Sequence, residues 1–127
     1  MDKKYIDGFV LAVPKEKLDS YREMAQKMAK LMKKYGALKY IEAVGEDMNP
    51  KMMEGMEIAK FPQMVQARPD EVVMFSFIVF ESRAHRDEVN ARVMKDPFLN
   101  DSEMKEKMMP FDMKRMAYGG FEVIVES

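Results

Sequence analysis

The run Glu71–Phe80 (EVVMFSFIVF) restricts the fold of this chain more than any other segment, because almost all of its side chains are apolar. It is too short for a typical helix and is rich in β-branched and aromatic residues, which favour a strand. A strand that is apolar continuously, rather than at alternate positions, is covered on both faces of its sheet. The sequence therefore predicts a strand inside a sheet with a packed layer on each side.

Two strands and one helix are predicted before this run. Lys4–Val13 is rich in β-branched and aromatic residues and precedes Pro14, a common first residue of helices. Apolar residues three and four positions apart then predict a helix over Lys15–Tyr35, with Gly36 at the position of a C-terminal cap. Leu38–Glu46 alternates imperfectly between apolar and polar residues, which is typical of an edge strand.

The remaining segments give the chain the order β-α-β-β-α-β. We expect a long connection at Asp47–Asp70, with a helical turn near Phe61–Val65. A helix at Ser82–Lys95 follows and ends at Asp96-Pro97, and a shorter helix is expected at Ser102–Met108. The last strand is expected at Lys114–Glu126, where the Gly119-Gly120 pair marks a bulge or a close backbone approach. Right-handed crossovers place both long helices on one face of an antiparallel sheet. The predicted fold is a single ferredoxin-like α+β domain over residues 1–127.

The helix-free face of this sheet is expected to be apolar. The first, third and fourth strands carry apolar side chains at both parities, with Tyr5, Phe9, Leu11, Val73, Phe75, Phe77 and Val79 at odd positions and Ile6, Val10, Met74, Ile78 and Phe80 at even positions. A monomer in water rarely leaves so large an apolar face uncovered. A second copy is the simplest cover, because one two-fold rotation buries the same patch on both partners. We therefore expect a homodimer that pairs sheet to sheet.

Composition argues against several classes of function. The chain has 21 Lys and Arg against 22 Asp and Glu, so a net charge of −1 gives no basic field for nucleic acid. It has no cysteine, which excludes disulfides and iron–sulfur clusters and permits a reducing compartment, so we expect the cytoplasm. Neither a membrane span nor an export signal is indicated. A single histidine cannot form a multi-histidine site, and we predict no metal and no cofactor.

Sixteen methionines are an unusual number for a chain of 127 residues. Several recur at helical spacing, as at Met24, Met28 and Met32. One interpretation is a thioether site for Cu(I), because soft sulfur ligands select that ion. The other is adaptable packing, because methionine is flexible and fills irregular gaps. We favour packing, since helical spacing puts these sulfurs where core-facing leucines would otherwise lie.

Several segments together resemble a known family. They are Tyr5–Val10, Glu71–Ser76, Asp96-Pro97, Met109-Pro110-Phe111-Asp112, Lys114–Met116 and Tyr118–Glu122. Over nearly the whole chain the sequence is similar to the uncharacterised YbaA-like family, although it has Met113 where relatives tend to have glycine. That family belongs to the dimeric α/β-barrel superfamily, so the resemblance implies two ferredoxin-like protomers packed sheet to sheet. The wider superfamily includes cofactor-independent monooxygenases, haem-degrading enzymes and small-molecule sensors, and kinship of fold does not choose between them.

Asp7 and His85 are the candidate catalytic residues. Asp7 lies in an otherwise apolar strand, where a buried carboxylate is costly unless it is paired or functional. It is either a general base in a cavity or, as we favour, a member of a structural salt bridge, with Arg115 as the expected partner. His85, in the first turn of the second long helix, is either a base or axial haem ligand or, as we favour, a partly exposed helix residue.

Four further residues are candidate ligand-binding groups, namely Glu42, Asp112, Arg115 and Tyr118. Three of them have a structural alternative of their own, and Arg115 is the expected partner of Asp7. Glu42 suits a solvated edge strand, Tyr118 suits the core, and Asp112 suits a turn in which its carboxylate accepts backbone hydrogen bonds.

Three functions follow from these residues. The first is a dimer that binds or senses a small apolar or aromatic molecule, because a mostly apolar sheet with a few polar groups is typical of a ligand pocket. The second is an enzyme of the cofactor-independent monooxygenase type that acts on an aromatic or quinol-like substrate, with Asp7 or His85 as base. The third is a structural or protein-interaction role. Convergence of Asp7, Arg115 and Tyr118 on one cavity would favour the first two.

Overall fold

The computed structural model describes residues 3–51, 54–101 and 113–127. Its elements are β1 (Tyr5–Pro14), the 3-10 helix η1 (Lys15–Lys17), α1 (Leu18–Lys34), β2 (Lys39–Val44), α2 (Phe61–Met64), β3 (Glu71–Phe80), α3 (Arg83–Met94), the 3-10 helix η2 (Met113–Arg115) and β4 (Ala117–Glu122). This order confirms the predicted β-α-β-β-α-β arrangement, with the short α2 inside the long connection. The helix predicted at Ser102–Met108 lies outside the described residues.

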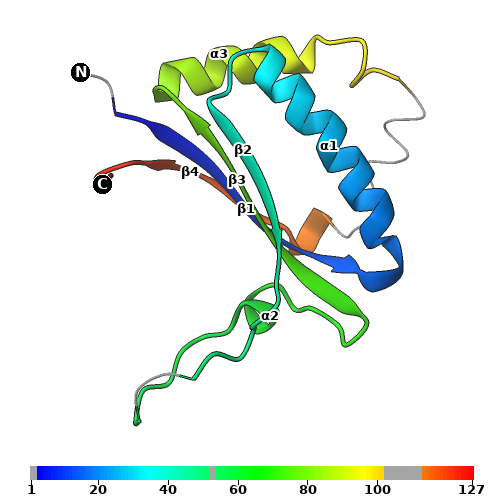
Figure 1. Ribbon diagram of the computed structural model, residues 1–127, viewed down its shortest axis with the longest axis vertical. Helices are drawn as coiled ribbons and strands as arrows, with labels where there is room; N and C mark the ends of the chain where they lie inside the picture. The colour runs from blue at the N-terminus through cyan, green and yellow to red at the C-terminus, as the bar shows by residue number, and fades with distance from the viewer. Residues whose placement is uncertain (1–2, 52–53, 102–112) are drawn as a thin grey trace.

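The strands form one antiparallel sheet in the order β2-β3-β1-β4. β1 and β3 occupy the centre and pair along their full length, from Tyr5 opposite Phe80 to Pro14 opposite Glu71. This order confirms the central position predicted for Glu71–Phe80 and the edge position predicted for β2. The long helices α1 and α3 lie on the same face of the sheet (Figure 1).

The strand register assigns each side chain to one face, because directly opposite residues of antiparallel strands point the same way. Tyr5 lies opposite Phe80, so the odd positions of β1 share a face with the even positions of β3. The odd-numbered and even-numbered apolar sets seen in the sequence therefore each mix residues from both faces. Apolar residues do occupy both faces, as predicted.

The helices bury the face that carries the even positions of β3. The larger core cluster contains Leu31, Met32, Ala37, Ile78, Phe80, Val89 and Val93. A second cluster joins Leu11, Val13 and Met74 of the sheet to Tyr21 and Ala25 of α1. Burial of these side chains is what holds α1 and α3 against the sheet.

The ends of the long helices follow their predicted caps. Gly36, after α1, has a φ of +113°, a conformation that costs glycine little because it has no Cβ. The backbone N–H groups of Gly36 and Ala37 donate to the carbonyls of Lys33 and Met32, at 3.2 and 3.0 Å, in the pattern of a Schellman motif. The hydroxyl of Ser82 accepts from the backbone N–H of the third residue of α3 at 3.0 Å.

Two boundaries differ from the prediction. Pro14 ends β1, and η1 intervenes before α1 begins at Leu18. β4 is shorter than the predicted strand, because η2 occupies its expected start. Gly119 and Gly120 pair one to one with β1, so this pairing has no bulge. Gly120 instead permits a close approach, since a Cβ there would collide with the ring of Tyr5.

The face opposite the helices is apolar and largely open in a single copy. Its side chains include Ile6, Val10, Ile41, Phe75, Phe77, Val79 and Phe121. Phe75 is 44% exposed and Phe121 is 60% exposed. One end is covered, because Val65 packs against Ala12 and Val73. The remaining helix-free surface is the apolar face that the sequence predicts.

Candidate functional site

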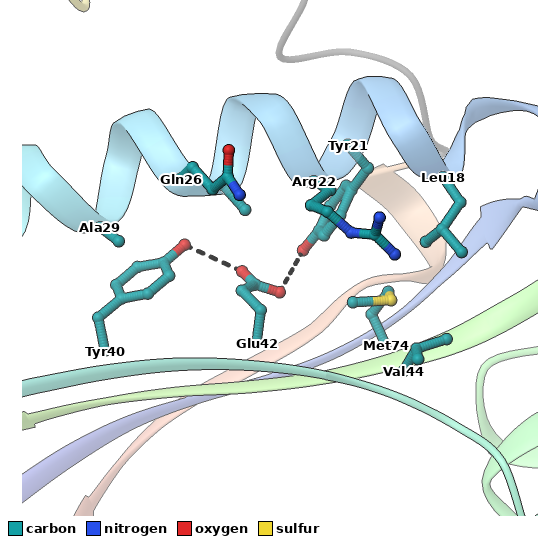
Figure 2. Close-up of a pocket in the computed structure, with 10 residues that line it drawn as sticks. Leu18, Tyr21, Arg22, Gln26, Ala29, Tyr40, Glu42, Val44 and Met74 are labelled. Atoms are coloured by element: carbon teal, nitrogen blue, oxygen red, sulfur yellow. Dashed lines mark hydrogen bonds between the residues drawn. The ribbon is translucent and has the colours of Figure 1, made fainter.

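Glu42 lies where the edge strand β2 runs past α1. Its side chain points to the helix face, opposite Ser76 of β3. The hydroxyl of Tyr21 donates to its Oε2 at 2.8 Å, and the hydroxyl of Tyr40 donates to its Oε1 at 2.9 Å (Figure 2). Each oxygen of the carboxylate therefore accepts one tyrosine hydrogen bond.

Local structure sets this arrangement. Tyr40 and Glu42 are two residues apart in one strand, so the alternation of side chains puts both on the same face. Tyr21 comes from the first half of α1, in the stripe that faces the sheet, and is 4% exposed. The site thus depends on α1 packing closely over β2.

Electrostatics separates the protonation states of the three groups. Burial raises the pKa of Glu42, and the hydrogen bonds from the tyrosines oppose that rise because they stabilise the charged form. Burial and the nearby carboxylate of Glu42 also raise the pKa of both Tyr21 and Tyr40. The tyrosines therefore remain protonated donors at neutral pH, and Glu42 is a partly buried carboxylate held by neutral groups.

These three residues line a hollow of about 340 Å³ between α1 and β2, which we name the edge hollow (Figure 2). The rest of its lining is Leu18, Arg22, Ala25, Gln26 and Ala29 from α1 and Val44 and Met74 from the sheet. Mostly apolar walls with a few polar groups are typical of small-molecule sites, which measure roughly 300–1,000 Å³. The edge hollow meets this description at its lower limit of size.

A second hollow of about 260 Å³ lies between α1 and the centre of the sheet. We name it the methionine hollow, because Met24, Met28, Met32, Met113 and Met116 all line it. Tyr21, Tyr40 and Glu42 line it as well, so they form a wall shared by both hollows. The helical spacing of its first three methionines places them toward the sheet, in agreement with a packing role.

Asp7 lies in a different neighbourhood, near the start of β1, which is one of the two central strands of the sheet. It is 1% exposed and faces the helices. Arg86 of α3 donates from Nη1 to its Oδ1 at 2.8 Å, and Nδ2 of Asn90 lies 3.5 Å from its Oδ2. The structural salt bridge favoured for Asp7 is thus present, and it joins α3 to the centre of the sheet.

Arg86 also reaches the neighbouring strand. Its Nη1 donates to the hydroxyl of Tyr118 at 3.2 Å, and its guanidinium lies 4.9 Å from the ring centre of Tyr5. Tyr118 stacks on Phe9 at 4.7 Å. Burial, followed by the charge of Asp7, raises the pKa of Tyr118. Asp7 and Tyr118 are therefore brought together, through Arg86.

The predicted pairing of Asp7 with Arg115 is wrong. Arg115 donates from Nη1 and Nη2 to the two carboxylate oxygens of Glu71, each at 2.7 Å. This bidentate hydrogen bond holds the pKa of Glu71 at about 2. Glu71 lies opposite Pro14, at the other end of β1 from Asp7. The error arose because Arg115 precedes β4, on η2, instead of lying within the strand.

His85 does not join the cluster around Asp7. His85 is half-buried near the start of α3, and its Nδ1 accepts the backbone N–H of Glu81 at 3.0 Å. Its ring lies 6.0 Å from that of Phe80. Asp112 lies outside the described residues. Among the predicted site residues that the structure describes, Asp7 and Tyr118 meet, whereas Glu42 and Arg115 lie at separate places.

Three residues of these clusters are not singled out by the sequence, namely Tyr21, Tyr40 and Arg86. Tyr21 reads as one more member of the apolar stripe of its helix. The one available signal was the spacing of Tyr40 and Glu42, which places a hydroxyl and a carboxylate on the same face of a strand. Arg86 gives no local signal, because its partner is remote in sequence.

The described part of the chain has neither a metal-binding cluster nor a helix that could cross a membrane. Within residues 3–51, 54–101 and 113–127, no group of three or more histidine, aspartate and glutamate side chains could hold a metal ion. Within the same ranges, no helix is long and apolar enough to cross a membrane.

Comparison with solved structures defines the class of fold. A crystal structure described as a dimeric ferredoxin-like protein, from an uncultured marine organism, aligns with a TM-score of 0.58 and 15% identity. The alignment covers 99% of this chain and 100% of that one. The protein is therefore an α+β protein with a ferredoxin-like fold.

Comparison of sequences gives the family. The family described as "Protein of unknown function (DUF1428)" matches residues 4–113. The "Uncharacterized protein YbaA" of Escherichia coli (strain K12) and that of Shigella flexneri are each 46% identical over 125 residues, which span 97% of this chain and 98% of theirs. The chain belongs to the DUF1428 family, and the resemblance to YbaA is confirmed.

We predict that breaking the Asp7–Arg86 pair from one side strongly destabilises the fold. Arg86→Met leaves a buried carboxylate without a cation, which costs about 3–5 kcal/mol in the free energy of unfolding. Urea denaturation followed by circular dichroism measures the loss. The control is Arg92→Met, which breaks an exposed pair with Glu88 and costs less than about 0.5 kcal/mol. Equal losses for the two variants would contradict the prediction.

We predict that Glu42→Gln gains stability relative to wild type as the pH rises. The pKa of Glu42 lies above its ordinary value of 4.5, so the folded protein retains a proton that the unfolded chain releases. The stability that Glu42 contributes is therefore complete below the unfolded pKa and is lost as the pH rises through the folded pKa. Glutamine at position 42 does not titrate, so the variant does not lose this contribution to the free energy of unfolding as the pH rises.

Urea denaturation at a series of pH values from acid to neutral tests this difference. The control is Glu46→Gln, which removes an exposed carboxylate just beyond the same strand. A pH profile for Glu42→Gln that runs parallel to that of Glu46→Gln would show that burial does not disfavour the charge at Glu42.

Proposed function

We propose that the protein is a homodimer that binds a small apolar or aromatic molecule in the edge hollow and the methionine hollow. The observation that carries this proposal is the position of Glu42. Its carboxylate and the two tyrosine hydroxyls stand in the wall shared by the two hollows. A few oriented polar groups within apolar walls are what a ligand site requires.

The two hollows would have different tasks. The edge hollow, open beside β2, supplies the polar groups that orient a ligand. The methionine hollow supplies an apolar wall of flexible side chains, which adapt to the shape of an aromatic or aliphatic body. Of the polar groups expected from the sequence, Glu42 belongs to this site together with Tyr21 and Tyr40, whereas Asp7, Arg115 and Tyr118 lie elsewhere in the fold.

Catalysis by Asp7 or His85 has less support than binding. A general base has to reach a proton of its substrate. Both oxygens of Asp7 face side chains of α3, and its side chain is 2% exposed. Nδ1 of His85 already accepts a backbone N–H. We therefore favour a binding protein over an enzyme of the monooxygenase type.

The helix-free face supports the proposal of a homodimer. It exposes Phe75 and Phe121, and Phe61 extends it beyond the sheet, with its ring 6.5 Å from that of Phe75. An open apolar face of this kind marks an interaction surface. The solved neighbour at 15% identity is described as dimeric, which supports a second copy as the partner.

We predict that neutral aromatic compounds raise the melting temperature and that filling the edge hollow abolishes the effect. A ligand that binds only the folded state stabilises it by mass action. Differential scanning fluorimetry against a library of small aromatic compounds measures the shift. Ala29→Trp places an indole in the edge hollow, and Lys30→Trp adds the same group at the next, exposed position as a control.

Shifts that persist in Ala29→Trp would place the ligand outside the edge hollow. If no compound of the library shifts the wild-type protein, the proposed binding function is wrong, and a structural or protein-interaction role takes its place.

We predict that Phe75→Asp converts a dimer to a monomer. A charge at the centre of the apolar face carries a large desolvation cost on association. Light scattering after size exclusion should give about twice the chain mass of 14.8 kDa for wild type and the single mass for the variant. Lys30→Asp, on the helix side, is the control and should remain dimeric. A monomeric wild type would refute the dimer.

A further inference from the structure

Glu42 is distinguished from the other buried or partly buried carboxylates by its partners. Asp7 pairs with Arg86 at 2.8 Å, and Glu71 pairs with Arg115 at 2.7 Å. Glu42 is held by two hydroxyls, and among the described residues no lysine, arginine or histidine lies within ion-pair distance of it. Hydroxyl groups supply hydrogen bonds but no compensating charge, so within the described residues nothing neutralises this partly buried carboxylate.

The groups that face Glu42 come from three elements. α1 contributes Tyr21, Arg22 and Gln26, β2 contributes Tyr40, and β3 contributes Ser76. Arg22 is the charged group among them, and Figure 2 shows it beside Tyr21. Its Nη1 lies 3.8 Å from Asp19, and its side chain is 64% exposed. Arg22 therefore has a solvated acidic partner of its own.

With respect to the described residues, the carboxylate also has unused hydrogen-bonding capacity. An ionised carboxylate oxygen offers two acceptor sites, and each oxygen of Glu42 accepts one hydrogen bond from a tyrosine hydroxyl. A ligand that entered the edge hollow with N–H donors would complete these sites. An anionic ligand at Arg22 would instead have to approach a carboxylate in the same hollow.

We propose that the edge hollow selects small organic cations, namely protonated amines carried on an aromatic or aliphatic body, with the ammonium group bonded to Glu42. The body lies against Ala25, Ala29, Val44 and Met74 of the hollow. Two tyrosine rings stand beside the carboxylate, and aromatic rings attract cations through their negative faces. This inference rests on the proposed binding function and specifies the class of ligand.

The charge on Glu42 makes binding of such a cation depend on pH. Burial raises the pKa of Glu42, so at mildly acid pH a fraction of the molecules carries a proton on this carboxyl group. These molecules have to lose that proton before Glu42 can bind an ammonium ion. Tyr21 and Tyr40 keep their protons in this range, because burial and the carboxylate of Glu42 raise the pKa of both hydroxyls. Amine affinity therefore rises from acid to neutral pH.

Three indole compounds of nearly equal shape test the inference. They are tryptamine, which is a cation at neutral pH, its neutral alcohol analogue tryptophol, and the anion indole-3-propionate. Isothermal titration calorimetry on the full chain should show that tryptamine binds about tenfold tighter than tryptophol or more, since hydrogen bonds to charged groups contribute about 1.5–3 kcal/mol. The preference should disappear in Glu42→Gln and persist in Glu46→Gln.

The outcomes separate this inference from the proposed function. Equal or tighter binding of tryptophol or indole-3-propionate overturns cation selection and leaves small-molecule binding intact. Failure of all three compounds to bind at their solubility limits contradicts both. If Glu42→Gln does not fold, the pH series on wild type decides, because tryptamine affinity has to rise toward neutral pH while tryptophol affinity stays constant.

Discussion

The antiparallel pairing of β1 with β3 is the contact on which the rest of the structure depends. It runs the full length of both strands, from Tyr5 opposite Phe80 to Pro14 opposite Glu71. Because side chains alternate along a strand, this one register decides which residues lie beneath the helices and which lie on the open face. A slip by one residue would turn Asp7 away from Arg86. The core, the salt bridge and the apolar face therefore follow from a single alignment.

Three carboxylates at this sheet show three ways of accommodating a charge. Asp7 is fully buried and is compensated by Arg86, and Glu71 receives a bidentate hydrogen bond from Arg115. Glu42 sits at the edge of the sheet, where water is nearer, and is held by hydroxyls alone among the described residues. A fully buried charge requires a cation, whereas a charge at an edge tolerates neutral donors. This difference is why Glu42 is the carboxylate suited to a ligand.

The sequence predicts the fold well because fold depends on pattern. The continuous apolar run Glu71–Phe80, the helical spacing before Gly36 and the serine cap of α3 are local signals, and each agrees with the structure. The site is harder to predict because its contacts join residues far apart in the sequence. The predicted strand order places β4 beside β1, but Arg115 precedes the short β4 and therefore lies at the far end of β1 from Asp7, where it binds Glu71. In the sequence Tyr21 resembles any other core residue, because its hydrogen bond to Glu42 depends on the position of β2 in the fold.

The alternation of side chains in β2 has a consequence for how such a protein can diversify. Tyr40 and Glu42 point to the helices, while Ile41 between them points to the open face. Adjacent residues of one short strand therefore belong to different surfaces. Substitutions at one set of alternate positions can alter the proposed ligand site without changing the surface proposed for association, and substitutions at the other set can do the opposite. A single inserted residue, in contrast, would disturb both surfaces together, so this strand tolerates exchange of its side chains far better than a change in its length.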